Sequence, residues 1–80
     1  MNQRKVEEIA SNYKEQLQKL DNEALRSIIK NRIKAIEYAK KGIEEVDPEN
    51  LTDENIRLVA REMQIVANML LEERIQGRAN

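Results

Sequence analysis

The stretch DPENLTDEN, residues 47–55, lies between two long segments with helical periodicity and decides how they are connected. An Asp-Pro pair is typical of a helix end that is followed by a turn. Thr52 is a suitable N-cap for the next helix, and the negative charges of Asp53 and Glu54 suit the positive end of a helix dipole. The stretch therefore predicts one helix that ends near residue 46 and another that starts at residue 53.

Apolar residues recur at helical spacing on both sides of this turn, which predicts helices over about residues 22–46 and 53–75. Gly42 lies inside the first of these helices at a cost of about 1 kcal/mol relative to alanine, but the pattern stays in phase beyond it. The two helices are similar in length and joined by a short loop, so they should pack as an antiparallel hairpin. In that pairing Ala39 faces Ala60.

A third helix is predicted over about residues 3–20, where the apolar residues again follow the helical repeat: Val6, Ile9, Tyr13, Leu17 and Leu20. Asp21 is a suitable N-cap and favours a break after this helix, with one continuous helix that slips in phase as the alternative. Residues 76–80 are expected to form a frayed tail. The sequence thus predicts a single all-α domain over residues 1–80, an antiparallel helical hairpin plus an N-terminal helix in a three-helix bundle.

The size and composition of the chain favour self-association. A chain of 80 residues buries only a little over half of its unfolded surface, so its own core is a limited source of stability. Domains of this size often add disulfides, a metal ion or a second subunit. The sequence contains no cysteine and no histidine, which excludes disulfides and a metal site built from those residues. We therefore expect a homodimer or a larger oligomer.

Histidine and cysteine, which enzymes commonly use as bases and nucleophiles, are missing, and lysine would be the only substitute base. Ser11, Ser27 and Thr52 have no histidine to activate them. Neighbouring carboxylates, such as those of Glu72 and Glu73, diverge by about 100° on a helix and do not converge on one point. The sequence has neither a glycine-rich phosphate loop nor a metal-binding motif. We expect a non-enzymatic protein that uses no cofactor and no metal.

Nothing in the sequence indicates membrane insertion or export. No apolar run approaches the roughly 20 residues that cross a bilayer. The first residues, MNQRKVEEIA, lack the apolar region of a secretory signal. A cytoplasmic protein without a membrane partner is the expectation.

The predicted helix before the turn carries a basic stripe. Its four members fall within an arc of roughly 80° opposite the apolar face: Arg26, Lys30, Lys34 and Lys41. Such a stripe is the minimum electrostatic footprint of a nucleic-acid-binding protein. A solvated helix surface has the same appearance, and it is favoured by the net charge of -1 and by the absence of alternating aromatic residues for base stacking. Anion binding by the basic stripe therefore stays an alternative.

Arg32 points close to the centre of the apolar face of the same predicted helix, between Ile29 and Ile36. A buried arginine must be paired. Its guanidinium group is expected to reach a carboxylate such as that of Glu62 or Glu73, to pin a subunit interface, or to bind an anion in a groove. The sequence leaves these three interpretations open.

The predicted helix after the turn has two apolar faces. The main face covers an arc of roughly 140°, which is enough to pack against two helices. Leu58, Ile65 and Met69 form a second face, the apolar stripe. Three large apolar side chains in a row indicate a contact surface. The alternative is a helix so central in the bundle that its neighbours cover it nearly all round.

Together these features predict a small regulator or adaptor that binds a second copy of itself or another protein through the apolar stripe, with Arg32 as a further interface residue. The first alternative is a nucleic-acid-binding protein that uses the basic stripe. A second alternative is an inhibitor that binds a basic protein surface through residues 42–80, which carry nine acidic and four basic side chains.

One segment is similar to a known family. RIKAIEYAKKGIEEVDPENLTDENIRLV, residues 32–59, resembles the helical domain of archaeal GINS replication subunits, in which a basic helix precedes an N-L-T-x-E-E turn. The similarity covers about a third of the chain, which is much shorter than those subunits. No site residue is carried over from that family.

Overall fold

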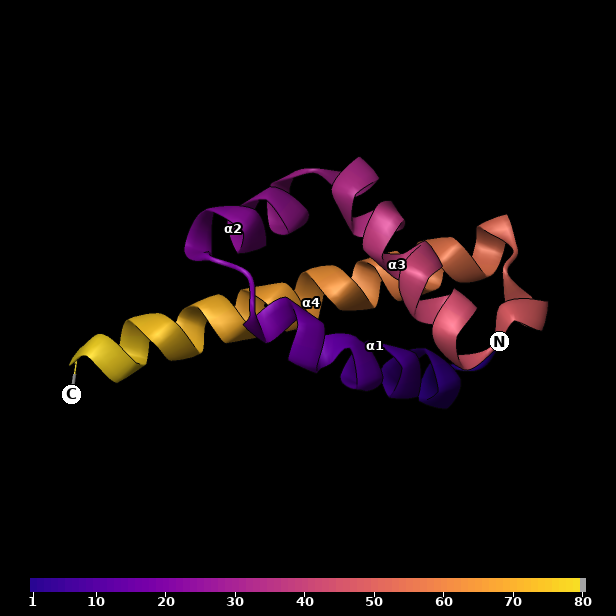
Figure 1. Ribbon diagram of the computed structural model, residues 1–80, viewed down its shortest axis with the longest axis horizontal. Helices are drawn as coiled ribbons and strands as arrows, with labels where there is room; N and C mark the ends of the chain where they lie inside the picture. The colour runs from indigo at the N-terminus through magenta and orange to yellow at the C-terminus, as the bar shows by residue number, and fades with distance from the viewer. Residues whose placement is uncertain (80) are drawn as a thin grey trace.

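The longest helix, α4 (Asp53–Ala79), is the axis on which the other helices pack (Figure 1). The computed structural model describes the backbone of residues 1–79 and the side chains of residues 1–77. Over these residues the other elements are α1 (Gln3–Gln18), α2 (Asn22–Lys30), α3 (Arg32–Val46) and the short 3-10 helix η1 (Pro48–Asn50). The all-α class is confirmed, but the described residues form four α-helices rather than three.

The helices surround α4 on two sides. α1 packs along one side and runs in the same direction as α4, whereas α2 and α3 pack along another side (Figure 1). α3 and α4 run in opposite directions and form the predicted hairpin. The C-terminal end of α4 extends beyond the other helices, and residues 76–79, expected to fray, continue the helix. Asn80, the last residue of that expected tail, lies outside the described residues.

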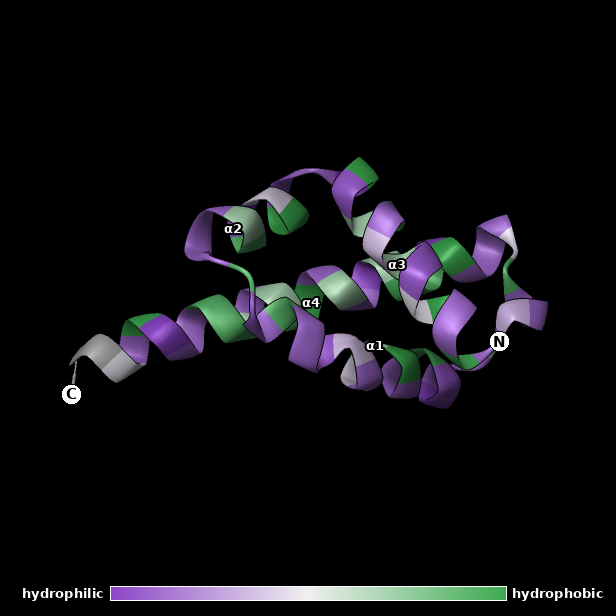
Figure 2. Cartoon of the chain, viewed as in Figure 1, coloured by the Kyte–Doolittle hydropathy of each residue, from purple (hydrophilic) through white to green (hydrophobic). Residues whose placement is uncertain are grey.

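A single apolar core fills the space between α4 and the other helices. Hydrophobic and hydrophilic residues alternate along α4 (Figure 2), as expected for a helix that contacts neighbours on some sides only. The fully buried side chains come from all four helices and include Ile9, Leu17, Leu25, Ile28, Ile43 and Met63. The core therefore depends on every helix, and none of the four is an independent unit.

The loop between α3 and α4 has the capping interactions that its sequence predicts. Thr52 Oγ1 accepts a hydrogen bond from the Asn55 N–H at 3.3 Å, which confirms Thr52 as the N-cap of α4. The side chain of Asn55 is buried and donates to the Asn50 carbonyl at 2.9 Å. Asn50 in turn donates from its side-chain amide to the Asp47 carboxylate. Polar residues of the loop thus hold both ends of the turn together.

The junction between α1 and α2 is also a capped break. Asp21 Oδ1 accepts a hydrogen bond from the Ala24 N–H at 2.8 Å, so the predicted break is confirmed and the continuous helix is wrong. Arg74 of α4 closes this junction with hydrogen bonds of 2.9 Å to Asn22 Oδ1 and 2.9 Å to the Gln18 carbonyl. Carbonyls at a helix C-terminus lack intrahelical partners, and Arg74 supplies one.

A second break, at Asn31, corrects the predicted helix over residues 22–46. Asn31 has extended backbone angles, φ -118° and ψ 104°, and it serves both as the C-cap of α2 and as the N-cap of α3. Its Oδ1 accepts from the Ile33 N–H at 3.0 Å. The change of direction lets α2 and α3 both pack against α4. The apolar spacing continues through residue 31, so it predicts no break there.

Gln64 of α4 compensates for the backbone hydrogen bonds that this break removes. Its Nε2 lies 3.2 Å from the Ile28 carbonyl and 3.2 Å from the Ile29 carbonyl, both in the last turn of α2. A continuous helix would satisfy these carbonyls through the N–H groups of residues 32 and 33. One half-buried side chain therefore stabilises the end of α2 from another helix.

Replacing Gln64 with leucine is expected to lower the free energy of unfolding by about 1–2 kcal/mol, because it leaves both carbonyls in a half-buried place without a donor. Urea denaturation followed by circular dichroism measures the loss. Asn68→Leu is the matched control, since Asn68 is exposed and, among the described residues, its amide donates only to Glu72 on the same helix. Equal stability of the two variants would show that Gln64 does not support the end of α2.

Two tyrosines pack edge to face where α1 meets α3. The ring centroids of Tyr13 and Tyr38 are 6.0 Å apart, and Tyr13 is buried. Burial raises the pKa of Tyr13 above its ordinary value of 10.0, and the charge of Glu45 raises it further, with a smaller effect of Tyr38. The folded state therefore holds the Tyr13 proton more tightly than the unfolded state does.

The raised pKa of Tyr13 predicts a loss of stability at alkaline pH. The contribution of the neutral phenol is fully present below the unfolded-state pKa and is lost as the pH rises through the higher pKa of the folded state. Tyr13→Phe removes the titrating group, so its urea midpoint should fall less than that of the unchanged protein between about pH 9 and pH 11. Parallel falls in the two proteins would show that another group causes the alkaline effect.

Candidate protein-interaction surface

The apolar stripe lies on the outer face of α4, away from the core. Leu58, Ile65 and Met69 are 38%, 45% and 48% exposed. These values show that the neighbouring helices do not cover α4 all round, so the alternative interpretation of the stripe as a buried second face is wrong. Large apolar side chains that are exposed in a row on one helix indicate a contact surface.

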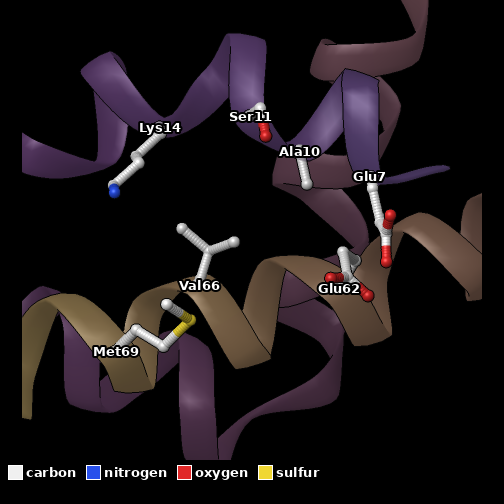
Figure 3. Close-up of a pocket in the computed structure, with 7 residues that line it drawn as sticks. All are labelled: Glu7, Ala10, Ser11, Lys14, Glu62, Val66 and Met69. Carbon is white, nitrogen blue, oxygen red and sulfur yellow. The ribbon is translucent and has the colours of Figure 1, made fainter. Parts of the chain in front are cut away.

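A groove between α1 and α4 borders this surface. Its volume is about 270 Å³, and its lining comes from both helices: Glu7, Ala10, Ser11, Lys14, Glu62, Val66 and Met69 (Figure 3). Met69 therefore belongs both to the apolar stripe and to the groove. Val66 and Ala10 supply further apolar lining. The groove widens the contact surface from one helix face to the space between two helices.

The two ends of the groove differ in charge. The carboxylates of Glu7 and Glu62 lie at one end, and the ammonium group of Lys14 lies at the other (Figure 3). Among the described side chains, the ion pairs within 4.0 Å join Lys5 to Glu8 and Lys34 to Glu37. Neither groove carboxylate takes part in them. Glu7 accepts a hydrogen bond from the side chain of Gln3 at 3.4 Å, so its only partner within its own helix is neutral.

The apolar stripe could be predicted from the sequence, but the groove could not. Glu62 and Met69 could be placed beside the stripe from the helical repeat alone. Glu7, Ser11 and Lys14 are spaced at the helical repeat and therefore share one face of α1. This shared face is the part of the groove that the sequence could have indicated. Their approach to α4 depends on how the two helices pack, which a repeat does not specify.

Arg32 is not at the centre of a buried face. It is the first residue of α3, directly after the break at Asn31, and its side chain is exposed. The expected burial assumed that the helical phase of α2 continues through residue 31, and the break removes that phase. α2 and α3 cover a different side of α4 from the outer face, so the structure does not bring Arg32 together with the apolar stripe.

The basic stripe is divided between two helices. Arg26 and Lys30 lie on α2, whereas Lys34 and Lys41 lie on α3, and the break at Asn31 separates the two pairs. All four are exposed. Lys34 pairs with Glu37 at 3.6 Å, and the Lys41 ammonium group lies 5.5 Å from the centroid of the Tyr38 ring. The continuous straight stripe expected from one helix is therefore wrong.

The fold and the surface define a small all-α domain with an exposed apolar helix face. No protein-family model matches the chain, and neither a curated protein nor a solved structure is significantly similar to it. The similarity of residues 32–59 to GINS subunits accordingly has no support from a family model. Among the described helices, none combines the length and the hydropathy that a membrane span requires.

Proposed function

We propose that the chain is a small non-enzymatic interaction module that self-associates through the outer face of α4. The observation that carries the proposal is the apolar stripe of Leu58, Ile65 and Met69, half exposed on the longest helix and bordered by a groove. Removing such a surface from water is favourable in proportion to the apolar area that is covered.

The length of the apolar stripe sets the extent of the proposed contact. At 1.5 Å per residue, the 27 residues of α4 span about 40 Å. The apolar stripe runs from Leu58 to Met69, eleven residues along this helix, so it spans about 17 Å of that length. Stable interfaces typically bury about 800 Å² per partner. The proposed contact therefore includes the groove and the neighbouring face of α1 as well as the apolar stripe.

The test is absolute mass in solution, measured by size-exclusion chromatography with light scattering over a range of concentrations. We expect a stable multiple of 9.4 kDa. Leu58→Lys combined with Ile65→Lys should return the mass to that of one chain without loss of helix in circular dichroism, because each lysine places a charge in the contact. A monomer at every concentration for the unchanged protein would refute self-association.

A matched control separates the outer face of α4 from exposed apolar residues in general. Ile33 and Leu51 are 69% and 38% exposed and lie outside α4. Ile33→Lys combined with Leu51→Lys makes the same chemical change away from the proposed surface, so this variant should keep the mass of the unchanged protein. Loss of association in the control would place the contact elsewhere.

The same observations favour a protein contact over nucleic-acid binding. The break at Asn31 divides the basic stripe, and two of its four members already have partners in the chain. Nucleic-acid binding requires several cations that are free to neutralise phosphates, and its affinity falls steeply with salt. A salt-dependent shift of DNA or RNA at low salt, abolished by Arg26→Glu and Lys30→Glu, would support the nucleic-acid alternative instead.

A further inference from the structure

We propose that the outer face of α4 and the adjoining groove also bind a basic amphipathic helix of another protein, one that carries lysine or arginine on both sides of an apolar stripe. The inference goes beyond self-association, because this partner would compete with a second copy for the same surface. The observation that carries it is an excess of carboxylates around the apolar stripe, with no cation of the chain paired to them among the described side chains.

The apolar stripe has carboxylates along both of its edges. At about 100° per residue, Glu54 and Glu72 lie about 40° to one side of its centre. Glu62 and Glu73 lie about 40° and 60° to the other side. Arg61, at about 60°, is the one cation of α4 within the same arc. Four carboxylates and one guanidinium group give this face a net charge of about -3.

These carboxylates are available to a partner. Glu54, Glu72 and Glu73 are exposed, and Glu62 is half-buried at the edge of the groove. The ion pairs of the described side chains join residues elsewhere on the surface. Glu72 accepts a hydrogen bond at 3.4 Å from the neutral amide of Asn68. An approaching lysine or arginine therefore meets carboxylates that have no cation to displace within the described part of the chain.

The spacing of the apolar stripe selects a helix as the partner. Leu58, Ile65 and Met69 are separated by seven and four residues, which matches positions d, d and a of a heptad repeat. Glu62 occupies the a position between them. A helix that lies along α4 has the same rise per residue, so its apolar side chains can contact the stripe over its whole length. A lysine or arginine that faces Glu62 would compensate for the burial of that carboxylate.

The groove suits a long basic side chain of such a helix. Ala10 and Val66 supply its apolar lining, and Glu7 and Glu62 lie at its acidic end (Figure 3). Lysine and arginine can lay an apolar stem along such a lining while the charged head reaches a carboxylate. Lys14, at the other end of the groove, repels a second cation there and so directs the charged head to the acidic end.

A second copy of this chain offers the same apolar stripe but not the opposite charge. Two such faces bring a net charge of about -3 on each side into contact, which opposes their association whatever the orientation of the two helices. A basic helix replaces this repulsion with attraction. Self-association should therefore strengthen as added salt screens the charges, whereas binding of the basic helix should weaken. The opposite responses to salt distinguish the two contacts.

A synthetic helical peptide of three heptads tests the proposal. It has leucine at positions a and d, apart from one lysine at the central a position, and lysine at positions e and g, so that its own copies repel one another. Fluorescence anisotropy of the labelled peptide measures binding to the full chain. We expect binding that weakens about threefold or more between about 50 and 300 mM salt. A peptide of the same composition with its leucines redistributed around the helix should not bind. Absence of binding by the first peptide, or equal binding of the two, would overturn the proposal.

Charge removal from the protein locates the contact. Glu62→Gln combined with Glu72→Gln removes one carboxylate from each edge of the stripe and should weaken peptide binding about threefold or more. Glu23→Gln combined with Glu44→Gln is the matched control, because it removes the same charge from exposed residues of α2 and α3, which cover a different side of α4. Equal losses in the two variants would show that net charge alone attracts the peptide, contrary to the proposal.

Light scattering separates this proposal from self-association. If the unchanged protein is a dimer, the peptide should convert it to complexes of one chain with one peptide. A dimer that persists with the peptide bound would place the peptide elsewhere and contradict the proposal. If the unchanged protein is a monomer, self-association is refuted, and the same titrations test the peptide contact directly.

Discussion

Replacing Leu25 with alanine is expected to lower the free energy of unfolding by about 2–5 kcal/mol, as core leucine-to-alanine changes do. Leu25 is fully buried, and with Ile28 it supplies the buried side chains of α2. α2 has only nine residues, and a helix of that length is unstable by itself in water. The folding of α2 therefore depends on the contact of Leu25 with the core. The expected loss of about 2–5 kcal/mol is a large part of the roughly 5–15 kcal/mol that stabilises a typical domain.

The control for Leu25 is Ile33, an aliphatic residue of similar size that the sequence analysis assigned to the same predicted helix. Ile33 is 69% exposed, so Ile33→Ala should change stability by no more than about 0.5 kcal/mol. Urea denaturation followed by circular dichroism gives both values. Similar losses for the two variants would mean that α2 and α3 do not pack as described.

Replacing Gly42 with leucine is expected to cost about 2–3 kcal/mol, because it forces a large side chain into a filled core. A Cβ atom at Gly42 would lie 3.0 Å from Met63 Cε and 3.3 Å from Ile9 Cγ2. Met63 and Ile9 are themselves fully buried, so they have little room to move. Leucine is a good helix former and recovers most of the roughly 1 kcal/mol that glycine costs inside a helix. A lower free energy of unfolding in this variant therefore comes from its packing in the core and not from helix propensity.

Gly77 offers the matched control for Gly42. Apart from its chain neighbours and the backbone of its own helix, no atom of the described residues lies within 4 Å of a Cβ atom placed there. Gly77→Ala should therefore leave stability unchanged or raise it by up to about 1 kcal/mol. Gly42→Ala should give a small change of either sign, since the gain in helix propensity opposes the close contact with Met63. A Gly42→Leu variant as stable as the unchanged protein would show that α3 does not approach α1 and α4 this closely.

Much of the fold could be predicted because the signals that define it are local. Thr52 and Asp21 cap their helices by accepting hydrogen bonds from the N–H groups three residues later, so the neighbouring sequence specifies them. The apolar repeat likewise identified the hairpin and the exposed stripe on α4. The predicted exposure of Leu58, Ile65 and Met69 as a separate face is confirmed in the structure.

The break at Asn31 could not be predicted from local sequence signals alone. Asparagine is a good N-cap, but the apolar repeat runs through this position. Because the repeat was extended across Asn31, Arg32 was wrongly expected at the centre of an apolar face. What makes the break tolerable is Gln64, a residue more than thirty positions away, which donates to the carbonyls that the break leaves free. A sequence repeat contains no information on such a partner.

The sequence by itself determined the helical class, the capped turns and the two apolar faces of α4, because each depends on side chains within one or two helical turns of one another. The tertiary structure alone decided the direction of α2, the exposure of Arg32 and the groove in which Glu7 meets Glu62. Those features depend on the distances between helices, and these distances follow from how the buried side chains of all four helices fill one core.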